Sequence, residues 1–468
     1  MRSYRILLVL TLLAGTQARA DLVISNRPTQ GMSCSGGVCE QVSKRAVLNA
    51  GDLAGMLADG DVTVEGQGPR PNIVLDAPLS WTSASALTLN SQNHIVFNSP
   101  LVVAGPGGLN LIGVLEYSAK GHVELWDKTS ALTIDQEPYV LAFSFGDLVH
   151  LAKTAQYIAL AKSVRAPKKT FPSSPIPSFG SDFGWFGMID GLGNAISHLT
   201  IDDETTSDPV GLVGTLHSGS FVSHIVLSDV SVRGSGVEKI TGSLIGENMG
   251  GVYGASATGT VTASGSASYA GGLVGRNETG TVIRSHAGVD VSVDGTAFVE
   301  GGLVGFSASD IEFSYATGAV HGADDTTMGG LVGINDEFVR YCYATGAVSG
   351  GDAAIAGGLV GGNGTDDPTF AFISDSYATG AASGGPHAFI GGVIGSDAAE
   401  TPNDHDYWDL DLSGVNAGAG NRAHDPGLKG LTTAEFQSGL PRGLSKSIWA
   451  EAPDVNGGFP YLRDQPPF

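Results

Sequence analysis

Short apolar runs separated by small and polar residues occur along most of the chain, and in its second half they recur regularly. The pentapeptide Gly-Gly-Leu-Val-Gly, or a close variant, returns about every 28 to 34 residues, a period that predicts a solenoid rather than a globular domain. Two looser copies lie earlier, at 210–214 and 242–246. The regular copies are Gly271 to Gly275, Gly301 to Gly305, Gly329 to Gly333, Gly357 to Gly361 and Gly391 to Gly395.

A second motif, Ser-Tyr-Ala-Thr-Gly or a close variant, follows the first and contains Tyr315, Tyr343 and Tyr377, while a weaker copy has His286 in place of the tyrosine. Each unit therefore predicts two short strands, with glycines expected to supply positive φ at the corners. Stacked about 4.8 Å apart, such strands pair their backbone groups with the coils above and below. The sequence predicts an all-β, right-handed parallel β-helix with a short helical insertion and an irregular C-terminal cap.

The side of the sheet on which the tyrosines lie stays open. Alternation places Tyr315 on the same side as Ile311 and Phe313, which favours an inward-facing ring. In a later copy Asp375 shares that alternation with Tyr377, which opposes an inward orientation.

Together the two motifs resemble the GLUG repeat of bacterial filamentous-haemagglutinin-like adhesins. Residues 190–201 resemble the segment that introduces such repeats, and the tail from Tyr407 to Leu462 is also similar to that family. The resemblance covers residues 47–465 and implies an adhesin-like β-helix. It implies no catalytic residues, because the family shares none, and the Asn-Pro-Asn-Gly signature of two-partner secretion is missing.

The beginning of the chain predicts export. Met1 to Ala20 combines a basic start, a short apolar run and a small-x-small cleavage site, which is typical of a secretory signal peptide. Alternating apolar runs then predict further strands, and helical spacing predicts helices over Asp52 to Leu57 and Phe145 to Val164. We therefore expect a signal peptide (1–20), an N-terminal segment (21–46), N-terminal β-helix coils (47–144), a helix and Pro-rich linker (145–189), a repeat β-helix (190–403) and a C-terminal cap (404–468).

Composition limits the partners. A net charge of −23 argues against nucleic acid and anionic membranes, which select basic surfaces. No later stretch approaches about 20 uninterrupted apolar residues, so the mature chain is expected to lack a transmembrane anchor. We expect a secreted or bacterial cell-surface protein, with the periplasm as the alternative. Its ligand would be an unknown surface receptor or glycan, and a separate outer-membrane export pore is a candidate partner.

Three cysteines are present. Cys34 and Cys39 lie close together, and an exported context favours a small-loop disulfide over a metal site. Cys342 replaces the serine of the second motif and is expected to be buried.

The acidic and histidine residues are the candidates for catalysis. Acids in repeat turns are usually solvated, although weak Ca²⁺ binding stays open. His198, His224 and His286 form no metal-binding motif, and we expect no metal and no cofactor. The candidate acids are Asp202, Asp203, Glu204, Asp324, Asp325, Asp336, Glu337, Asp366 and Asp367.

The sequence therefore predicts a non-catalytic, adhesin-like protein that binds a surface or carbohydrate through variable loops at 277–280, 322–327 and 362–367. The alternative is a carbohydrate-active β-helix enzyme, a polysaccharide lyase or hydrolase, with converging carboxylates. Aromatic residues scattered through 404–468 are expected to cover the end of the solenoid, and an aromatic ligand platform is the alternative.

Overall fold

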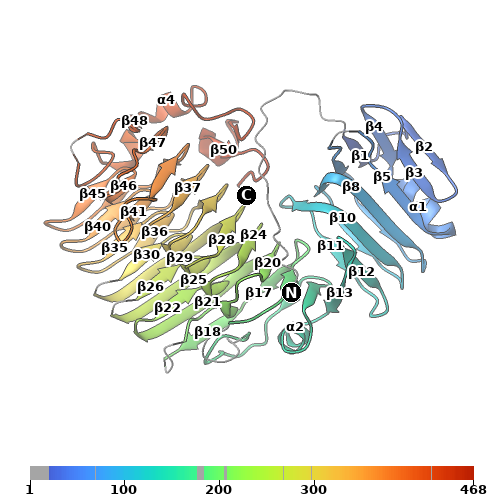
Figure 1. Cartoon of the computed structure of the whole chain (residues 1–468), viewed down its shortest axis with the longest axis horizontal. Coiled ribbons are helices and arrows are strands. Elements are labelled where there is room, and N and C mark those ends of the chain that lie inside the picture. The colour runs from blue at the N-terminus through green and yellow to red at the C-terminus, as the bar shows by residue number, and fades with distance from the viewer. Residues whose placement is uncertain are drawn as a thin grey trace.

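The computed structural model describes residues 21–68, 70–176, 184–204, 208–266, 268–296, 298–422 and 424–467. Strands dominate it, and nearly all of their pairings are parallel, which confirms the predicted parallel β-helix. Figure 1 shows two stacks of strands, one blue to cyan and the other green to orange, that meet at an angle near β11 and α2. The predicted signal peptide, residues 1–20, lies outside the described residues.

The first solenoid starts earlier than the predicted boundary at residue 47. Strand β1 pairs with both β4 and β6, because the alternating Leu22 and Ile24 are fully buried in the first core. Residues 21–46 therefore belong to this solenoid. Its strands are β1 (Leu22–Ser25), β2 (Met32–Ser35), β3 (Val38–Gln41), β4 (Ala46–Asn49), β5 (Val62–Glu65), β6 (Ile73–Leu75), β7 (Leu79–Trp81), β8 (Ala86–Phe97), β9 (Leu101–Val103), β10 (Gly108–Tyr117), β11 (Val123–Leu125) and β12 (Ala131–Ile134).

A hairpin and a helix close the N-terminal end of the first solenoid. The predicted disulfide is confirmed: Cys34 and Cys39 lie opposite each other on antiparallel β2 and β3, with Cα atoms 4.1 Å apart. Gly36 and Gly37, with φ of +57° and +81°, form the tight turn between them. Helix α1 (Ala50–Asp59) is longer than predicted, because the Asn49 side chain caps it by accepting from two backbone N–H groups.

An antiparallel hairpin joins the two solenoids. Strand β12 turns through Asp135 and Gln136, with φ of +48° and +71°, into β13, and the parallel stacking then resumes. The buried apolar side chains form two main clusters, and the first of them continues past the hairpin to Ala159 and Leu192, so the two solenoids are packed against each other.

The second solenoid contains a sheet that continues from the first and three further sheets. The continuing sheet consists of β13 (Glu137–Ala142), β14 (Tyr157–Leu160), β16 (Met188–Asp190), β20 (Phe221–Ser223), β24 (Gly251–Tyr253), β28 (Thr281–Ile283), β32 (Ile311–Glu312), β37 (Phe338–Arg340) and β42 (Phe372–Ser374). The next consists of β15 (Val164–Arg165), β17 (Ala195–Ser197), β18 (Thr200–Asp203), β21 (Val226–Val237), β25 (Ser256–Ser266), β29 (His286–Thr296), β33 (Tyr315–Ala316), β34 (Val320–His321), β38 (Tyr343–Ala344), β39 (Val348–Ser349), β43 (Tyr377–Ala378), β44 (Ala382–Ser383), β47 (Asp406–Asp409) and β48 (Leu428–Leu431).

The remaining two sheets carry the first motif. One consists of β19 (Val213–Leu216), β23 (Ile245–Asn248), β27 (Val274–Asn277), β31 (Val304–Ser307), β36 (Val332–Asn335), β41 (Val360–Asn363) and β46 (Ile394–Asp397). The other consists of β22 (Ile240–Gly242), β26 (Tyr269–Gly271), β30 (Val299–Gly301), β35 (Thr327–Gly329), β40 (Ile355–Gly357) and β45 (Phe389–Gly391).

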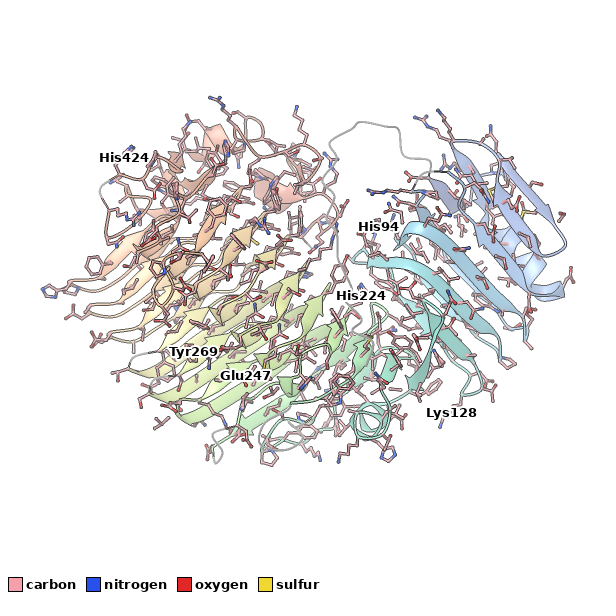
Figure 2. The ribbon with its side chains drawn as sticks, viewed as in Figure 1. His94, Lys128, His224, Glu247, Tyr269 and His424 are labelled. Carbon is pink, nitrogen blue, oxygen red and sulfur yellow. A yellow bond between two sulfur atoms is a disulfide. The ribbon has the colours of Figure 1, made fainter. Side chains whose placement is uncertain are left out.

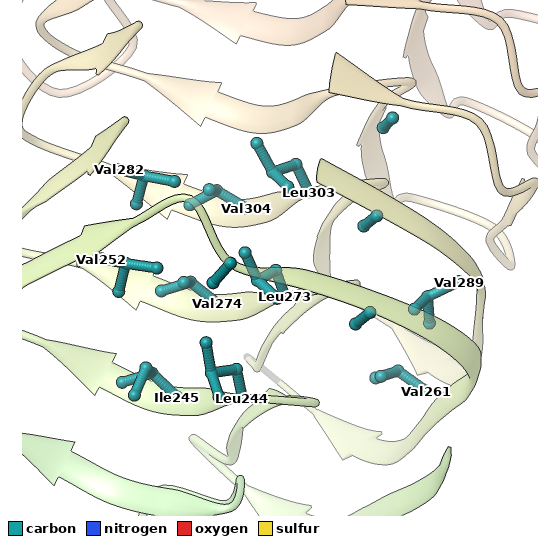
Figure 3. Close-up of a cluster of buried hydrophobic side chains, with 14 of the residues drawn as sticks. Leu244, Ile245, Val252, Val261, Leu273, Val274, Val282, Val289, Leu303 and Val304 are labelled. Carbon is teal, nitrogen blue, oxygen red and sulfur yellow. The ribbon is translucent and has the colours of Figure 1, made fainter. Parts of the chain in front are cut away.

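The apolar pair of the first motif fills the interior of the second solenoid. Leu273 and Val274 are fully buried, and the corresponding pairs stack above and below them, as Figure 3 shows for Leu244 with Ile245 and Leu303 with Val304. Since like side chains lie at matching positions in successive coils, the core is a continuous set of ladders.

The repeat glycines act differently from the prediction, because none of the glycines that begin and end the five regular copies has a positive φ. They are needed for close approach instead. A Cβ on Gly271 would overlap the carbonyl oxygen of Val274, and a Cβ on Gly330 would overlap that of Gly358 in the next coil. The left-handed conformation falls on larger corner residues, including Arg284, with φ of +51°, and Phe313, with φ of +49°.

The structure resolves the orientation of the tyrosines. Ala316 belongs to the interior core, whereas its neighbour Tyr315 belongs to a separate cluster on the outer face. The left-handed corner at Phe313 interrupts strand alternation, so counting through it gives the wrong side. The rings of Tyr315, Tyr343 and Tyr377 stack with centroids 4.7 and 5.2 Å apart.

The C-terminal segment does more than cover the end of the solenoid. Its strands β47 and β48 extend one sheet, and the following residues fold back over the tyrosine stack. Trp449 and Phe436 are fully buried there, which excludes them as an exposed aromatic platform. The elements of this segment include α3 (Leu410–Ser413), α4 (Thr433–Phe436), β49 (Trp449–Ala450), a 3₁₀ turn (Asn456–Gly458) and β50 (Tyr461–Leu462).

The long helix predicted over Phe145 to Val164 is wrong. Helix α2 covers only Phe145–Leu151, capped by the Ser144 side chain, which accepts from the Asp147 N–H at 3.1 Å. Residues 157–160 then form β14, because their Ile and Leu side chains complete the core as a strand. Tertiary packing therefore overrides the helical spacing of this segment.

Buried asparagines form a further ladder that the sequence did not predict. Asn277, expected in a variable loop, is fully buried at the end of β27; its side-chain oxygen accepts from Asn248 at 2.7 Å and its amide donates to Ser307 at 3.0 Å. In later coils Asn335 donates to Asn363 at 2.9 Å. These hydrogen bonds give partners to polar side-chain groups whose burial without partners would destabilise the fold.

We predict that Gly330→Ala destabilises the second solenoid by about 3 kcal/mol, because the new Cβ displaces the Gly358 carbonyl. Gly288→Ala is the matched control: its Cβ would meet Thr317 Oγ1 at 3.2 Å, and the corresponding residue of the preceding coil is Thr258. Urea unfolding followed by circular dichroism measures both variants. Equal midpoints for the two variants would contradict the close-approach role of Gly330.

Candidate functional site

An open hollow lies where the second solenoid begins, and it is built partly from the turn that follows α2. The helix ends in short-range backbone bonds, with the Lys153 N–H donating to the His150 carbonyl at 3.1 Å and the Thr154 N–H to the Leu151 carbonyl at 2.9 Å. This turn leaves the side chains of Lys153, Thr154 and Gln156 exposed on the rim.

The other wall comes from residues 184–186. Trp185 is fully buried, and its indole N–H donates to the Ala152 carbonyl at 2.8 Å, which ties this segment to the turn after α2. Its backbone N–H donates to the Thr215 carbonyl at 2.6 Å, and its carbonyl accepts from the His217 N–H at 2.9 Å. These bonds fix the next residue, Phe186, beside the His217 ring.

Phe186 is the exposed aromatic residue of the hollow. Its side chain is 54% exposed, and its ring meets the His217 ring edge to face, with centroids 5.6 Å apart. The His217 Nδ1 lies 2.6 Å from the Ser218 carbonyl oxygen, which orients the imidazole. The hollow holds about 530 Å³ and is lined by Ala152, Lys153, Thr154, Ala155, Gln156, Gly184, Trp185, Phe186 and His217.

The lining has an unusual charge for this chain. Among the described residues the lining includes one lysine, one histidine and no carboxylate, although Asp and Glu outnumber Lys and Arg by 47 to 24 in the whole sequence. The described lining is therefore less acidic than the chain as a whole.

Sequence reasoning missed this site because residues 145–189 were assigned to a helix and a linker. The paired aromatics Trp185 and Phe186 between Gly184 and Gly187 were the available signal. Part of the predicted linker, residues 177–183, lies outside the described residues.

The predicted acidic candidates have structural contacts instead of converging on the hollow. Asp203 lies 3.2 Å from the Nζ of Lys239, and both side chains are almost completely buried. Asp202 and Glu204 lie 3.9 and 3.5 Å from the Arg233 guanidinium.

The acids of later repeats bond mainly to neighbouring backbone. Asp324 accepts from the Asp352 N–H at 2.7 Å, and Asp336 accepts from the Asp366 N–H at 3.2 Å. Burial raises the pKa of both the Asp336 and Glu337 carboxyls. In the part of the chain that the structure describes, no group of three or more His, Cys, Asp or Glu residues could hold a metal ion.

The three histidines singled out from the sequence have different environments. His286 begins the outer aromatic stack, 4.6 Å from the Tyr315 ring, and burial lowers its pKa to about 4. His198 is partly exposed and lies 3.2 Å from Asp229. His224 is buried, with its Nδ1 3.0 Å from Asp190.

Cys342 is fully buried, as predicted. Burial raises the pKa of its thiol, so it remains protonated and unreactive. Cys342 thus takes the place of the serine of the second motif as a buried side chain of similar size.

Comparison with known proteins gives two kinds of similarity. No protein-family model matches the chain. A curated relative, halomucin from Haloquadratum walsbyi, is 34% identical over 112 residues, which are 24% of this chain and 1% of that protein. The chain therefore corresponds to only a small part of that relative.

Solved structures with a similar fold are described as proteases. A structure described as IgA1 protease aligns with a TM-score of 0.40 and 18% identity over 65% of this chain and 23% of its own. A candidate immunoglobulin A1 protease from Bacteroides ovatus aligns with a TM-score of 0.45 and 15% identity over 70% of this chain and 93% of its own.

This finding corrects the expectation that the chain is not an enzyme, because both of these similar structures are described as enzymes. At such low identity the similarity concerns the fold alone, and it assigns no catalytic residue here. The chain is a β-helix protein whose disulfide is compatible with secretion.

The disulfide bears on location. The Cys34–Cys39 bond fits a protein that folds in an oxidising compartment, and a secreted or extracellular location is consistent with it. Within the described ranges, no helix combines the length and apolar character needed to cross a membrane.

A buried carboxyl outside the hollow predicts a pH-dependent stability. Glu300 is fully buried beneath Gly322, and neither of its carboxyl oxygens has a hydrogen-bond partner among the described residues. Burial raises the pKa of this carboxyl well above the ordinary glutamate value of 4.5. Its stabilising contribution is therefore complete below about pH 4.5 and is lost as the pH rises through the raised pKa.

We predict that Glu300→Met stabilises the protein by about 2 kcal/mol at neutral pH and flattens the fall in stability above about pH 4.5, because no buried carboxyl remains to be ionised. Glu400→Met, at an exposed position, is the control and should change neither quantity. Unfolding midpoints between about pH 4 and pH 8 test this. A destabilised Glu300→Met variant with the wild-type pH slope would show that Glu300 is not the source.

Proposed function

We propose that the chain is an exported, adhesin-like protein that binds carbohydrate in the Phe186 hollow. The observation that supports this most directly is a half-exposed aromatic ring held in an open hollow whose described lining residues include no carboxylate. The GLUG-like repeats agree with a surface-binding role.

The chemistry of the hollow suits a sugar. A sugar ring presents C–H groups on one face, and these pack on the electron-rich face of an aromatic ring such as Phe186. Exposed hydroxyl, amide and ammonium groups on Thr154, Gln156 and Lys153 are able to bond to sugar hydroxyls at the rim. One apolar face with a few polar groups around it is typical of small-ligand sites.

The hydrogen-bonded backbone around the hollow supports a binding site that is already formed before a ligand arrives. Bonds from Trp185 to Ala152, Thr215 and His217 join three separate segments of chain before any ligand is present. Little ordering of these segments is therefore needed when a ligand binds, which favours affinity.

We predict that Phe186→Ala weakens glycan binding at least about tenfold, which corresponds to losing about 1.4 kcal/mol of contact. Phe370→Ala is the matched control, since Phe370 is also 54% exposed but does not line the hollow. A glycan array screens the wild-type protein, and calorimetry on the best ligand compares the variants. Equal loss in both variants, or none in either, would exclude the hollow as the binding site.

Lys153→Gln separates anionic from neutral sugars. For an anionic ligand, the variant should bind more weakly and with less dependence on salt, because a screened charge pair is removed. For a neutral ligand it should bind almost unchanged. Because the fold is shared with proteases, the same incubations are analysed for cleavage of the glycan and of its carrier protein.

Surface exposure is a separate prediction. On intact native cells, protease treatment should remove an antigen within residues 271–395 while a periplasmic protein survives. An antigen that resists protease until the outer membrane is broken would contradict the adhesin-like proposal and place the protein in the periplasm.

A further inference from the structure

Basic residues surround helix α2 at the base of the second solenoid. Residues 148–181 contain no aspartate and no glutamate, although the whole chain has a net charge of −23. Figure 1 shows α2 at the lower edge of the molecule, where the second solenoid begins. The lysines and arginines of this stretch all have exposed side chains, and we call them the basic surface: Lys153, Lys162, Arg165, Lys168 and Lys169.

The cations of the basic surface have no acidic partner among the described residues. Ion pairs are formed instead by other cations, such as Arg276, which lies 2.7 Å from Glu278 and 3.9 Å from Glu247. Figure 2 shows Glu247 among the strands of the repeats, apart from α2. The unpaired cations therefore attract an anion on a protein that otherwise repels one. The remaining ion-paired lysines and arginines are Arg233, Lys239, Arg284, Arg340 and Arg422.

Carboxylates at the border of the basic surface have partners of their own. Asp147 of α2 accepts from the Phe143 N–H at 3.2 Å. In the next coil, Asp202 and Glu204 lie 3.9 and 3.5 Å from the Arg233 guanidinium. These partners reduce the field of the carboxylates, so they oppose an anion near α2 less than free carboxylates would.

The chain bulges outward over residues 167–170, which are all exposed. On one side of the bulge, the Ala166 N–H donates to the Ser197 carbonyl at 2.9 Å, and on the other the Phe171 N–H donates to the Thr200 carbonyl at 2.9 Å. Five residue steps, from 166 to 171, thus correspond to three steps in the next coil, from 197 to 200. The additional residues project into solvent and present two lysines there.

Helix α2 connects this bulge to the Phe186 hollow. The Lys169 ammonium lies 4.5 Å from the centroid of the Phe171 ring, and that ring lies 5.5 Å from the ring of Phe145, the first residue of α2. At the other end of the helix, Lys153 follows α2 by two residues and lines the hollow. Seven helical residues span about 10 Å. Only an extended ligand therefore reaches both the hollow and the bulge.

We propose that the basic surface extends the hollow and that the ligand is an acidic polysaccharide several sugar units long. This inference rests on the proposed binding of carbohydrate in the hollow. One sugar packs on Phe186 beside Lys153, and the following units pass along α2 to the other cations. Their ammonium and guanidinium groups donate charge-assisted hydrogen bonds to the carboxylates or sulfates of the polymer.

Two other classes of polyanion fit this surface less well. A nucleic acid or an anionic membrane presents dense charge over an area larger than the band around α2. The rest of the protein, with its net charge of −23, repels such an extended charge. A single polysaccharide chain contacts the band alone.

The test compares galacturonic acid, an oligogalacturonate and its methyl-esterified form, which keeps the backbone without the charge. Calorimetry should show that the wild-type protein binds the acidic oligomer most tightly, with an affinity that falls as salt is added. The triple variant Arg165→Gln, Lys168→Gln, Lys169→Gln should bind this oligomer at least about tenfold more weakly at low ionic strength. Its affinity for the monomer should stay unchanged, because the monomer reaches only the hollow.

A second triple variant is the matched control. Lys429→Gln, Arg442→Gln, Lys446→Gln also removes two lysines and one arginine, and all three are exposed in the C-terminal segment. It should bind the oligomer as the wild type does. Equal weakening in both triple variants would show an effect of net charge alone and overturn the inference, as would wild-type affinity in the first variant.

Phe186→Ala separates this inference from the proposed function. If it loses the oligomer while the first triple variant keeps it, the hollow binds carbohydrate and the basic surface does not. If Phe186→Ala binds every sugar as the wild type does, the proposed function fails, and the extended site fails with it.

Dextran sulfate, beside neutral dextran, distinguishes a sulfated polymer from a carboxylated one, and binding of either polyanion with loss in the first triple variant supports the inference. Failure of the wild-type protein to bind both polyanions would contradict it. Tighter binding of a DNA duplex or of anionic phospholipid vesicles than of either polysaccharide would also contradict it.

Discussion

Close stacking of successive coils is the constraint on which the second solenoid depends. At Gly271 and Gly330 the backbone of a neighbouring strand occupies the space where a Cβ would stand, so the coils approach as nearly as their backbones allow. This approach aligns the Leu273 and Val274 ladders inside and the Asn277 ladder at the coil corner. Since every ladder shares one spacing, a residue of the wrong size in one coil affects its neighbours.

The fold could be predicted from the sequence because the motifs repeat once per coil, with the period of this stacking. The close approach at Gly330 excludes larger side chains, so the motif is repeated wherever the contact is repeated. The corners of the coils are harder to predict from the sequence, because Arg284 and Phe313 adopt a left-handed backbone conformation although neither is glycine. Their conformation follows from the coils on either side, and alternation counted through Phe313 therefore could not decide on which side Tyr315 lies.

The hollow was beyond prediction for a different reason. Phe186 and His217 belong to segments that do not repeat, and their contact arises only when the turn after α2 packs on Trp185. The spacing of apolar residues even favoured a helix over Phe145 to Val164, a range that includes strand β14. The same holds for His224 and Leu115, whose contact joins residues 109 positions apart in the sequence. Features made by distant, unrepeated segments leave no periodic trace in a single sequence.

The hollow and the contact between the solenoids lie at opposite ends of the same two strands. Phe186 precedes β16, which ends at Asp190, and His217 precedes β20, which ends one residue before His224. Strands β16 and β20 pair in parallel, with Asp190 opposite Ser223. The aromatic hollow is therefore built on the part of the second solenoid that the first solenoid holds in place.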